Sequence, residues 1–292
     1  VWLMEYTFPL ESKYKDLNFA LRVYNDLVDT LLSHGTTTAV YFSTIHEKAT
    51  RLLADICIKK GQRALIGKVV MDNHDQCPEY YRDTSYQDAL EKTVSFIEYV
   101  FAMKNNSDGL IKPVVTPRFI PSCSDKALEG LGKLAKLYGC HVQTHCSESD
   151  WEHNYVLKRT GVSDTKALKE FGLLGRRTIL AHCNFISGED MDIIADKGAA
   201  IAHCPLSNIY FSNAIFPLRR AIEKSVRVGL GTDLSGGPSA SMFDTCRYSL
   251  NMSRVLEEGT DSEKNNKIRG VEGSRIDFRE AFHLATAGGA DA

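Results

Sequence analysis

Three short apolar runs of this sequence each end close to a residue that can bind a metal ion or transfer a proton. GLGTD ends on Asp233, and a Gly-Gly-Pro turn follows shortly after it. Upstream, THCSE carries His145 and Glu148, and LAHC carries His182. Imidazole nitrogens and carboxylate oxygens are common zinc ligands and common general acids and bases. These four residues are therefore the first candidates for a catalytic site.

A cation and an aromatic ring follow another apolar run. Arg118 and Phe119 come directly after the run 110–116 and its Thr-Pro end. A guanidinium group donates hydrogen bonds to carbonyl-type acceptors while an aromatic ring stacks on a flat ligand, so this pair suits a planar, carbonyl-bearing molecule. The alternative is a surface ion pair over a packed phenylalanine. His203 stands before the end of its own run and is expected to pack in the interior.

The remaining histidines and the cysteines are interpreted as structural. No two cysteines form a CxxC pair, and several lie inside apolar runs, as buried free thiols do. Thiolate zinc sites normally show close cysteine pairs, so core packing and a reducing compartment are expected. The histidines interpreted in the same way are His34, His46, His74, His141, His153 and His283.

Short apolar strands alternate with amphipathic helices along the whole chain. Val226 and Val228 keep strand spacing, Leu131 and Leu134 keep helical spacing, and Ser187 has the pattern of a helix N-cap. Strands are expected at 36–42, 63–71, 110–116, 141–146, 178–183, 199–204 and 226–232, and helices at 16–33, 47–60, 84–104, 124–138, 163–171, 187–197, 214–224 and 239–257.

This alternation predicts an α/β fold with a parallel sheet, and the number of repeats in one domain, 1–292, favours a TIM-type (β/α)8 barrel. Such barrels place their chemistry at the carboxyl ends of the strands, which is where the candidate residues lie. Seven strands are expected, one fewer than a closed barrel needs. The segment 1–12 is predicted to be a loop that leads into the first helix, and the missing strand is expected to precede it.

Composition excludes several classes of function. The 292 residues carry a formal net charge of −2, with 43% hydrophobic and 25% charged residues. There is no basic field for nucleic acid and no polybasic patch for a membrane surface. No apolar stretch approaches the roughly 20 residues of a membrane span. A cytoplasmic enzyme with a small-molecule substrate is therefore expected.

Several segments together resemble a known group of enzymes. TPRF, HCSE, AHC, AHCPLSN and GLGTD, taken in chain order, resemble the amidohydrolase superfamily. Within it, EYTFP, HGTTTAVYF, GQRALIGKVVMD and HLATAGG are similar to the guanine deaminases. The HxxE and GTD patterns occur across many amidohydrolases, whereas TPRF together with GQRA and GKVVMD is much more particular. The resemblance extends over nearly the whole chain.

The resemblance implies a fold, a reaction and a role for each candidate. His145 and Asp233 would ligate one catalytic Zn²⁺, and Glu148 would shuttle protons. His182 would lie beside the metal and contact water or substrate, and Arg118 and Phe119 would orient a purine. The implied reaction is hydrolytic removal of the C2 amino group of guanine, which gives xanthine and ammonia in purine catabolism. A homodimer is also implied.

One feature of the superfamily has no counterpart in this sequence. The superfamily carries a His-x-His pair at the end of its first barrel strand, and the sequence contains no HxH. A catalytic zinc normally has three protein ligands, and His145 with Asp233 supplies two. The pair and an accessory β-domain are expected outside 1–292, so weak zinc binding and little activity are expected of these residues alone. Two alternatives remain: a sibling amidohydrolase that acts on another aminated or chlorinated ring, and a noncatalytic product that binds protein partners.

Overall fold

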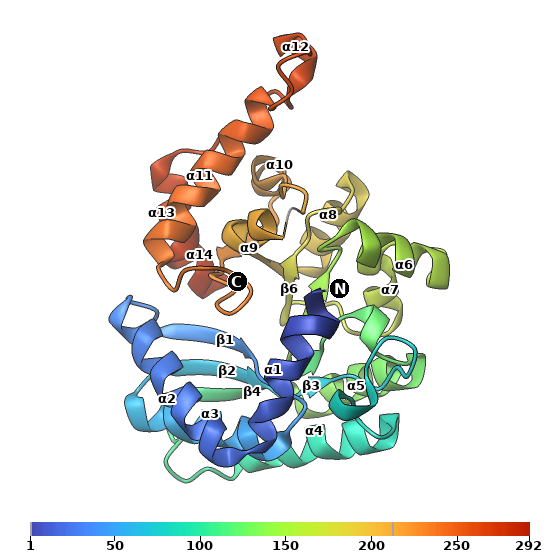
Figure 1. The fold of residues 1–292 in the computed structure, drawn as a ribbon, viewed down its shortest axis with the longest axis vertical. Coiled ribbons are helices and arrows are strands. Elements are labelled where there is room, and N and C mark those ends of the chain that lie inside the picture. The colour runs from blue at the N-terminus through green and yellow to red at the C-terminus, as the bar shows by residue number, and fades with distance from the viewer. Residues whose placement is uncertain (1, 212) are drawn as a thin grey trace. The chain divides into compact units, whose positions relative to one another are not determined.

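The computed structural model describes residues 2–211 and 213–292. The chain forms two compact units, and each is described by itself. Unit 1 comprises Val1–Thr144 and Glu170–Leu173, and unit 2 comprises His145–Lys169 and Leu174–Ala292. The single domain expected over 1–292 therefore stays a prediction. Both units contain parallel strands with helices between them, as the alternating sequence pattern predicts (Figure 1).

The sheet of unit 1 has the strand order β1, β2, β4 and the first four residues of β5, and β3 pairs with β4; the last two residues of β5 belong to unit 2. All of these pairs are parallel, with Val40 opposite Leu65 and Val114 opposite His141. Burial on both faces explains the nearly continuous apolar sequence of β4. The strands are β1 Thr38–Phe42, β2 Arg63–Gly67, β3 Val69–Val70, β4 Ile111–Pro117 and β5 His141–Cys146. The predicted strand 63–71 is thus divided in two at Lys68.

Four long helices accompany this sheet, and α3 packs against both α2 and α4 (Figure 1). They are α2 Leu17–Ser33, α3 Glu47–Lys60, α4 Tyr86–Phe101 and α5 Asp125–Tyr138. Their ends follow local chemistry. Ser124 accepts a hydrogen bond from the amide of Ala127 at the start of α5, and Gly61 ends α3 with φ 74°, a conformation that glycine adopts without strain. Short 3-10 helices cover Glu79–Tyr81 and Ile120–Ser122.

The prediction of a loop over 1–12 is wrong. Leu3–Thr7 form a π-helical turn, Phe8–Ser12 form α1, and Lys13–Lys15 form a 3-10 turn. Proline is tolerated in the first turn of a helix, so Pro9 does not prevent α1. The decisive contact is tertiary: Phe8 is buried, and its ring centroid lies 5.7 Å from that of Tyr81. A partner so distant in the sequence gives no local signal.

The strands of unit 2 are β6 Thr178–His182, β7 Ala200–His203 and β8 Arg227–Leu230, in that order and all parallel. Ser187 and Asp190 form the capping box of α8, which confirms the predicted N-cap. The short helices α6 and α9 and those from 266 onward were not predicted. The helices are α6 Asp150–Thr160, α7 Asp164–Glu170, α8 Gly188–Lys197, α9 Pro205–Tyr210, α10 Leu218–Glu223, α11 Met242–Glu258, α12 Asn266–Arg269, α13 Phe278–Ala285 and α14 Ala287–Asp291.

The structural interpretation of the cysteines is confirmed. All eight are free and buried, and burial raises the pKa of Cys57 to about 12. Within the described residues, no helix has the length and apolar character to cross a membrane.

Candidate active site

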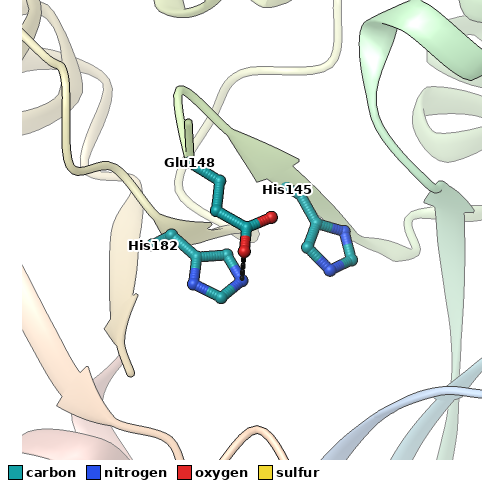
Figure 2. A group of neighbouring side chains, drawn as sticks. All are labelled: His145, Glu148 and His182. Carbon is teal, nitrogen blue, oxygen red and sulfur yellow. Dashed lines mark ion pairs between the residues drawn. The ribbon is translucent and has the colours of Figure 1, made fainter. Parts of the chain in front are cut away.

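Three of the predicted residues come together in unit 2. One ligand atom from each of His145, Glu148 and His182 lies within 4.8 Å of the others. The two imidazole rings are nearly parallel, with centroids 5.3 Å apart and an interplanar angle of 17°. Glu148 Oε1 lies 3.8 Å from His182 Nε2, and Figure 2 shows the carboxylate beside that ring with His145 on its other side.

The backbone at the two strand ends explains how these side chains reach one place. His145 is the last but one residue of β5, and His182 is the last residue of β6. The backbone turns through left-handed conformations at these strand ends, with φ of 46° at Ser147, 70° at His182 itself and 59° at Cys183. Such values are uncommon for residues other than glycine. The amide of Cys183 donates to the carbonyl oxygen of Cys146 at 2.9 Å, so the two loops are joined directly behind the histidines.

Two buried carboxyl groups hold the segment that carries Glu148. Glu152 Oε2 accepts a hydrogen bond from the backbone amide of Glu148 at 2.7 Å. Asp164 Oδ2 accepts one from the hydroxyl of Ser147 at 2.9 Å, and its Oδ1 accepts one from the Ser147 amide at 3.3 Å. Burial, together with the charges of Asp164 and Glu148, raises the pKa of Glu152 well above its usual range. Burial likewise raises the pKa of Asp164.

The position of Glu152 has a faint signal in the sequence. Ser149 is the N-cap of α6, and its hydroxyl accepts a hydrogen bond from the amide of Glu152. The Ser-x-x-Glu spacing predicts a helix start there. Asp164 gave no such signal.

His182 is buried, and its Nδ1, the ring nitrogen that does not face Glu148, contacts an asparagine. Its Nδ1 lies 2.9 Å from Asn208 Oδ1, and Asn208 Nδ2 donates to Asn184 Oδ1 at 2.8 Å. Burial alone would lower the pKa of His182. The charges of Glu148 and Asp233 and the hydrogen bond to Asn208 outweigh burial, so the pKa of His182 lies above its ordinary value of 6.5.

Asp233 lies in the loop after β8 and is not part of the group of three. Its φ is 48°, and its carbonyl oxygen accepts a hydrogen bond from the amide of Gly236 at 2.9 Å. Its carboxylate lies against the same glycine, where an added Cβ would stand 2.5 Å from Oδ2. The charge of Asp233 nonetheless reaches His182 and contributes to its raised pKa. Its role as a zinc ligand stays a prediction.

Arg118 and Phe119 lie in unit 1, directly after β4. The guanidinium of Arg118 makes a two-pronged ion pair with Glu11, with Nη1 2.7 Å from Oε2 and Nη2 3.0 Å from Oε1. The guanidinium also lies over the ring of Phe8, 5.1 Å from its centroid. Burial alone would lower the pKa of Arg118, but the carboxylate of Glu11 outweighs burial and raises it. Phe119 is buried. Substrate binding by this pair stays a prediction, and Glu11 was not foreseen.

His203 packs in the interior, as expected. It is buried, its ring lies 5.2 Å from that of Phe216, and its Nδ1 has no hydrogen-bond partner among the described residues. Burial, reinforced by the charge of His182, lowers the pKa of His203 to about 3, so its ring is neutral at physiological pH.

The sequence profile of the amidohydrolase family matches residues 5–292. The chain belongs to the amidohydrolase family. A guanine deaminase of Dictyostelium discoideum is 41% identical over 290 residues, which are 99% of this chain and 61% of that protein. This amidohydrolase therefore spans about three fifths of the length of that relative.

Solved structures agree with the family assignment. A guanine deaminase from C. acetobutylicum, crystallised with guanine in its active site, is 33% identical with a TM-score of 0.89, over 99% of this chain and 66% of that one. An adenosine deaminase from Xanthomonas campestris with bound zinc is 21% identical with a TM-score of 0.82, over 100% of this chain and 61% of that one, which shows the shared fold. The predicted amidohydrolase-type α/β fold is confirmed.

The residues of the site suit a zinc ion. Two imidazole nitrogens and a carboxylate oxygen are typical zinc donors, and three protein donors leave a fourth position open for water. Glu148, His145 and His182 of this amidohydrolase supply such a set within 4.8 Å. The contact between His182 Nδ1 and the amide oxygen of Asn208, at 2.9 Å, is the kind of outer contact that orients metal-binding histidines.

Proposed function

We propose that this amidohydrolase catalyses the hydrolytic deamination of guanine to xanthine and ammonia. The grouping of His145, Glu148 and His182 within 4.8 Å of one another carries the proposal. The guanine deaminase relatives, which match along the whole chain, support guanine as the substrate. In the reaction, water adds its oxygen to C2 of the purine, the C2–N bond breaks, and ammonia leaves.

Glu148 is the proton carrier in this proposal. An amino group leaves an aromatic ring poorly unless a ring nitrogen is protonated during attack and the departing nitrogen receives a proton. The segment of Glu148 is anchored by Glu152 at its amide, while the carboxylate keeps partial access to solvent. A carboxyl group that is fixed at its backbone and partly exposed at its tip can deliver one proton to the ring nitrogen and then a second to the departing amino group; both protons come from the attacking water.

Two further residues handle charge. Asp233 can accept the proton that water loses during attack. His182 faces Glu148 through Nε2 and can stabilise charge that develops at the tetrahedral carbon.

A zinc ion would be held by His145, with Asp233 as the second ligand that the family resemblance implies. When bound, zinc supplies a Lewis acid that makes water nucleophilic near neutral pH. Glu148 and His182 lie close to His145, so either of them could bind the zinc ion in place of Asp233. Zinc titrations of Asp233→Asn and Glu148→Gln separate the possibilities, because loss of a ligand weakens zinc binding and loss of a proton carrier does not.

Arg118 and Phe119 are proposed to orient the purine. The guanidinium donates to acceptor atoms of the ring, and the phenylalanine offers an aromatic surface. A homodimer, a cytoplasmic location and a role in purine catabolism belong to the same proposal and rest on the family resemblance.

The deciding experiment combines metal analysis with a guanine-to-xanthine assay. It is run on 1–292 and on a version extended at its N-terminus by a strand that carries a His-x-His pair. The extended protein should bind about one zinc and form xanthine, and Glu148→Gln should retain zinc while losing roughly 100- to 10,000-fold in turnover. Glu129, exposed on α5, offers a matched control, because Glu129→Gln removes the same charge elsewhere.

The outcomes separate the candidates. Full turnover in Glu148→Gln would remove Glu148 from the mechanism. Turnover of another aminated or chlorinated ring in place of guanine would favour a sibling amidohydrolase. Stoichiometric zinc on 1–292 alone would contradict the expectation of weak binding there. Absence of zinc and of turnover from both proteins would favour a noncatalytic role.

A further inference from the structure

We infer that Asn208 and Asn184 are positioning residues that fix the tautomer of His182, placing the ring proton on Nδ1 and leaving Nε2 to act toward Glu148. The inference rests on the proposed function for its catalytic consequence. Its structural content rests on hydrogen bonds alone.

A chain of hydrogen bonds joins the loop after β5, the loop after β6 and the helix α9 that follows β7. Asn184 Nδ2 donates to the carbonyl oxygen of Glu148 at 2.9 Å, and Asn208 Nδ2 donates to Asn184 Oδ1 at 2.8 Å. Asn208 Oδ1 then meets His182 Nδ1 at 2.9 Å. The three side chains are buried, with exposed fractions of 6% for Asn184, 2% for Asn208 and 1% for His182, so water competes weakly for these bonds.

The direction of every bond follows from the backbone end of the chain. A peptide carbonyl oxygen can only accept, so the group of Asn184 that faces Glu148 must be its NH2. The oxygen of Asn184 therefore faces Asn208, which must present its own NH2 there. The oxygen of Asn208 is then left for His182, and an oxygen that only accepts requires a proton on Nδ1.

The consequence falls on the other ring nitrogen. A neutral imidazole with its proton on Nδ1 has a lone pair on Nε2, which lies 3.8 Å from Glu148 Oε1. That nitrogen can accept a proton or bind an electrophilic centre. The tautomer with its proton on Nε2 would place two acceptors, Nδ1 and Asn208 Oδ1, against each other in a buried site. One backbone carbonyl, that of Glu148, thus sets the chemistry of the histidine beside its own carboxylate.

The test reads the tautomer directly. Isotope-labelled histidine is followed by long-range proton–nitrogen correlation spectra, recorded at rising pH until the two ring-nitrogen signals of His182 stop shifting and the ring is neutral, and these signals are assigned from their loss in His182→Asn. The wild-type protein should show the Nδ1–H form. Asn208→Leu should lose it. Asn208→Asp should retain it, because a carboxylate still accepts from Nδ1 even though the donor to Asn184 Oδ1 is lost.

A control separates positioning from general destabilisation. Asn73 in unit 1 donates to the carbonyl oxygen of Pro121 at 2.7 Å and is also partly buried. Asn73→Leu should lower stability and leave the His182 signals unchanged. In a protein that turns over guanine, Asn208→Leu should lower kcat by about 10- to 100-fold with little change in KM, and Asn208→Asp should restore part of the loss.

An Nε2–H form in the wild type, or an unchanged tautomer in Asn208→Leu, would overturn the inference. Loss of the Nδ1–H form in Asn208→Asp would do the same, and this variant serves if the leucine variant does not fold. The spectra need neither zinc nor guanine. Failure of the guanine assay in the N-terminally extended protein, with an Nδ1–H signal present, would therefore refute the proposed function and leave this inference standing.

Discussion

The buried ion pair between Lys68 and Asp83 is expected to dominate the electrostatic contribution to the stability of unit 1. Both side chains are almost completely buried and in direct contact, and the second oxygen of Asp83 accepts the amide of Met71 at 3.0 Å. Asp83→Asn removes the charge, and its remaining oxygen can still accept from Met71. The substitution leaves the ammonium of Lys68 buried without a counter-charge.

The size of the effect follows from burial. Removing one member of a buried pair costs about 3–5 kcal/mol, because the remaining charge keeps its desolvation penalty without its attraction. A typical domain is stable by about 5–15 kcal/mol, so Asp83→Asn should remove a large part of the total. In Lys68→Met with Asp83→Asn no charge is buried, and the loss should fall to about 1–2 kcal/mol, the cost of one unpaired amide.

Urea unfolding of the wild type, both single variants and the double variant measures the coupling free energy. Lys60 and Asp29, which lie 2.6 Å apart on the surface, provide the control pair, with the Asp29 side chain 64% exposed. Asp29→Asn should cost about 0–1 kcal/mol. The reasoning would be refuted if Asp83→Asn lowered the free energy of unfolding by no more than Asp29→Asn does. It would also be refuted if the double variant lost more stability than the two single variants lose together.

Two further outcomes are expected. His203 has a pKa lowered to about 3 by burial, so it is neutral in the folded protein and charged in the unfolded chain below about pH 6.5. The contribution of His203 to the free energy of unfolding should therefore be fully present above pH 6.5 and should fall by up to about 1.4 kcal/mol per pH unit as the pH drops toward 3. In His203→Gln the free energy of unfolding should depend less steeply on pH. Equal slopes for the wild type and the variant, measured by urea unfolding at several pH values, would contradict this. Glu11→Gln should raise KM for guanine about tenfold with kcat nearly unchanged, because it weakens the two-pronged contact that orients Arg118; steady-state kinetics with an unchanged KM would argue against purine binding by Arg118.

Much of the fold was predictable because the strands are buried on both faces. All seven predicted strand regions contain strands, and most boundaries agree to within two residues. The break at Lys68 was not predictable, because Asp83 lies 15 residues away in an irregular segment. The helical start of the chain was missed for the same kind of reason, since Phe8 is fixed by Tyr81 rather than by its neighbours in sequence.

In the candidate site, too, some residues could be predicted from the sequence and others could not. His145, Glu148 and His182 were predictable because the carboxyl ends of parallel strands lie at one edge of a sheet, so a reactive residue at each end is a positional signal. Asn208 is the last residue of the AHCPLSN segment, but neither this segment nor the position of Asn184 indicates which groups the two side chains contact. Their role arises from hydrogen bonds to the backbone carbonyl of Glu148 and to the imidazole of His182, which are distant in the sequence. Neither periodicity nor residue type predicts such contacts.

The backbone conformation at the site explains why the reactive residues were predictable and the supporting residues were not. Ser147, His182, Cys183 and Asp233 all have positive φ, between 46° and 70°. Each such residue costs about 1–3 kcal/mol and persists only where its surroundings enforce that conformation. Asp164 binds both the amide and the hydroxyl of Ser147, and Cys183 is held by the carbonyl of Cys146. Sharp turns at the strand ends aim the reactive side chains, and the buried polar groups that escaped prediction are those that hold the turns. The residues of reaction and the residues of support are therefore separate sets: the first lie at or just after strand ends, which the sequence indicates, whereas the contacts of the second are set by the fold.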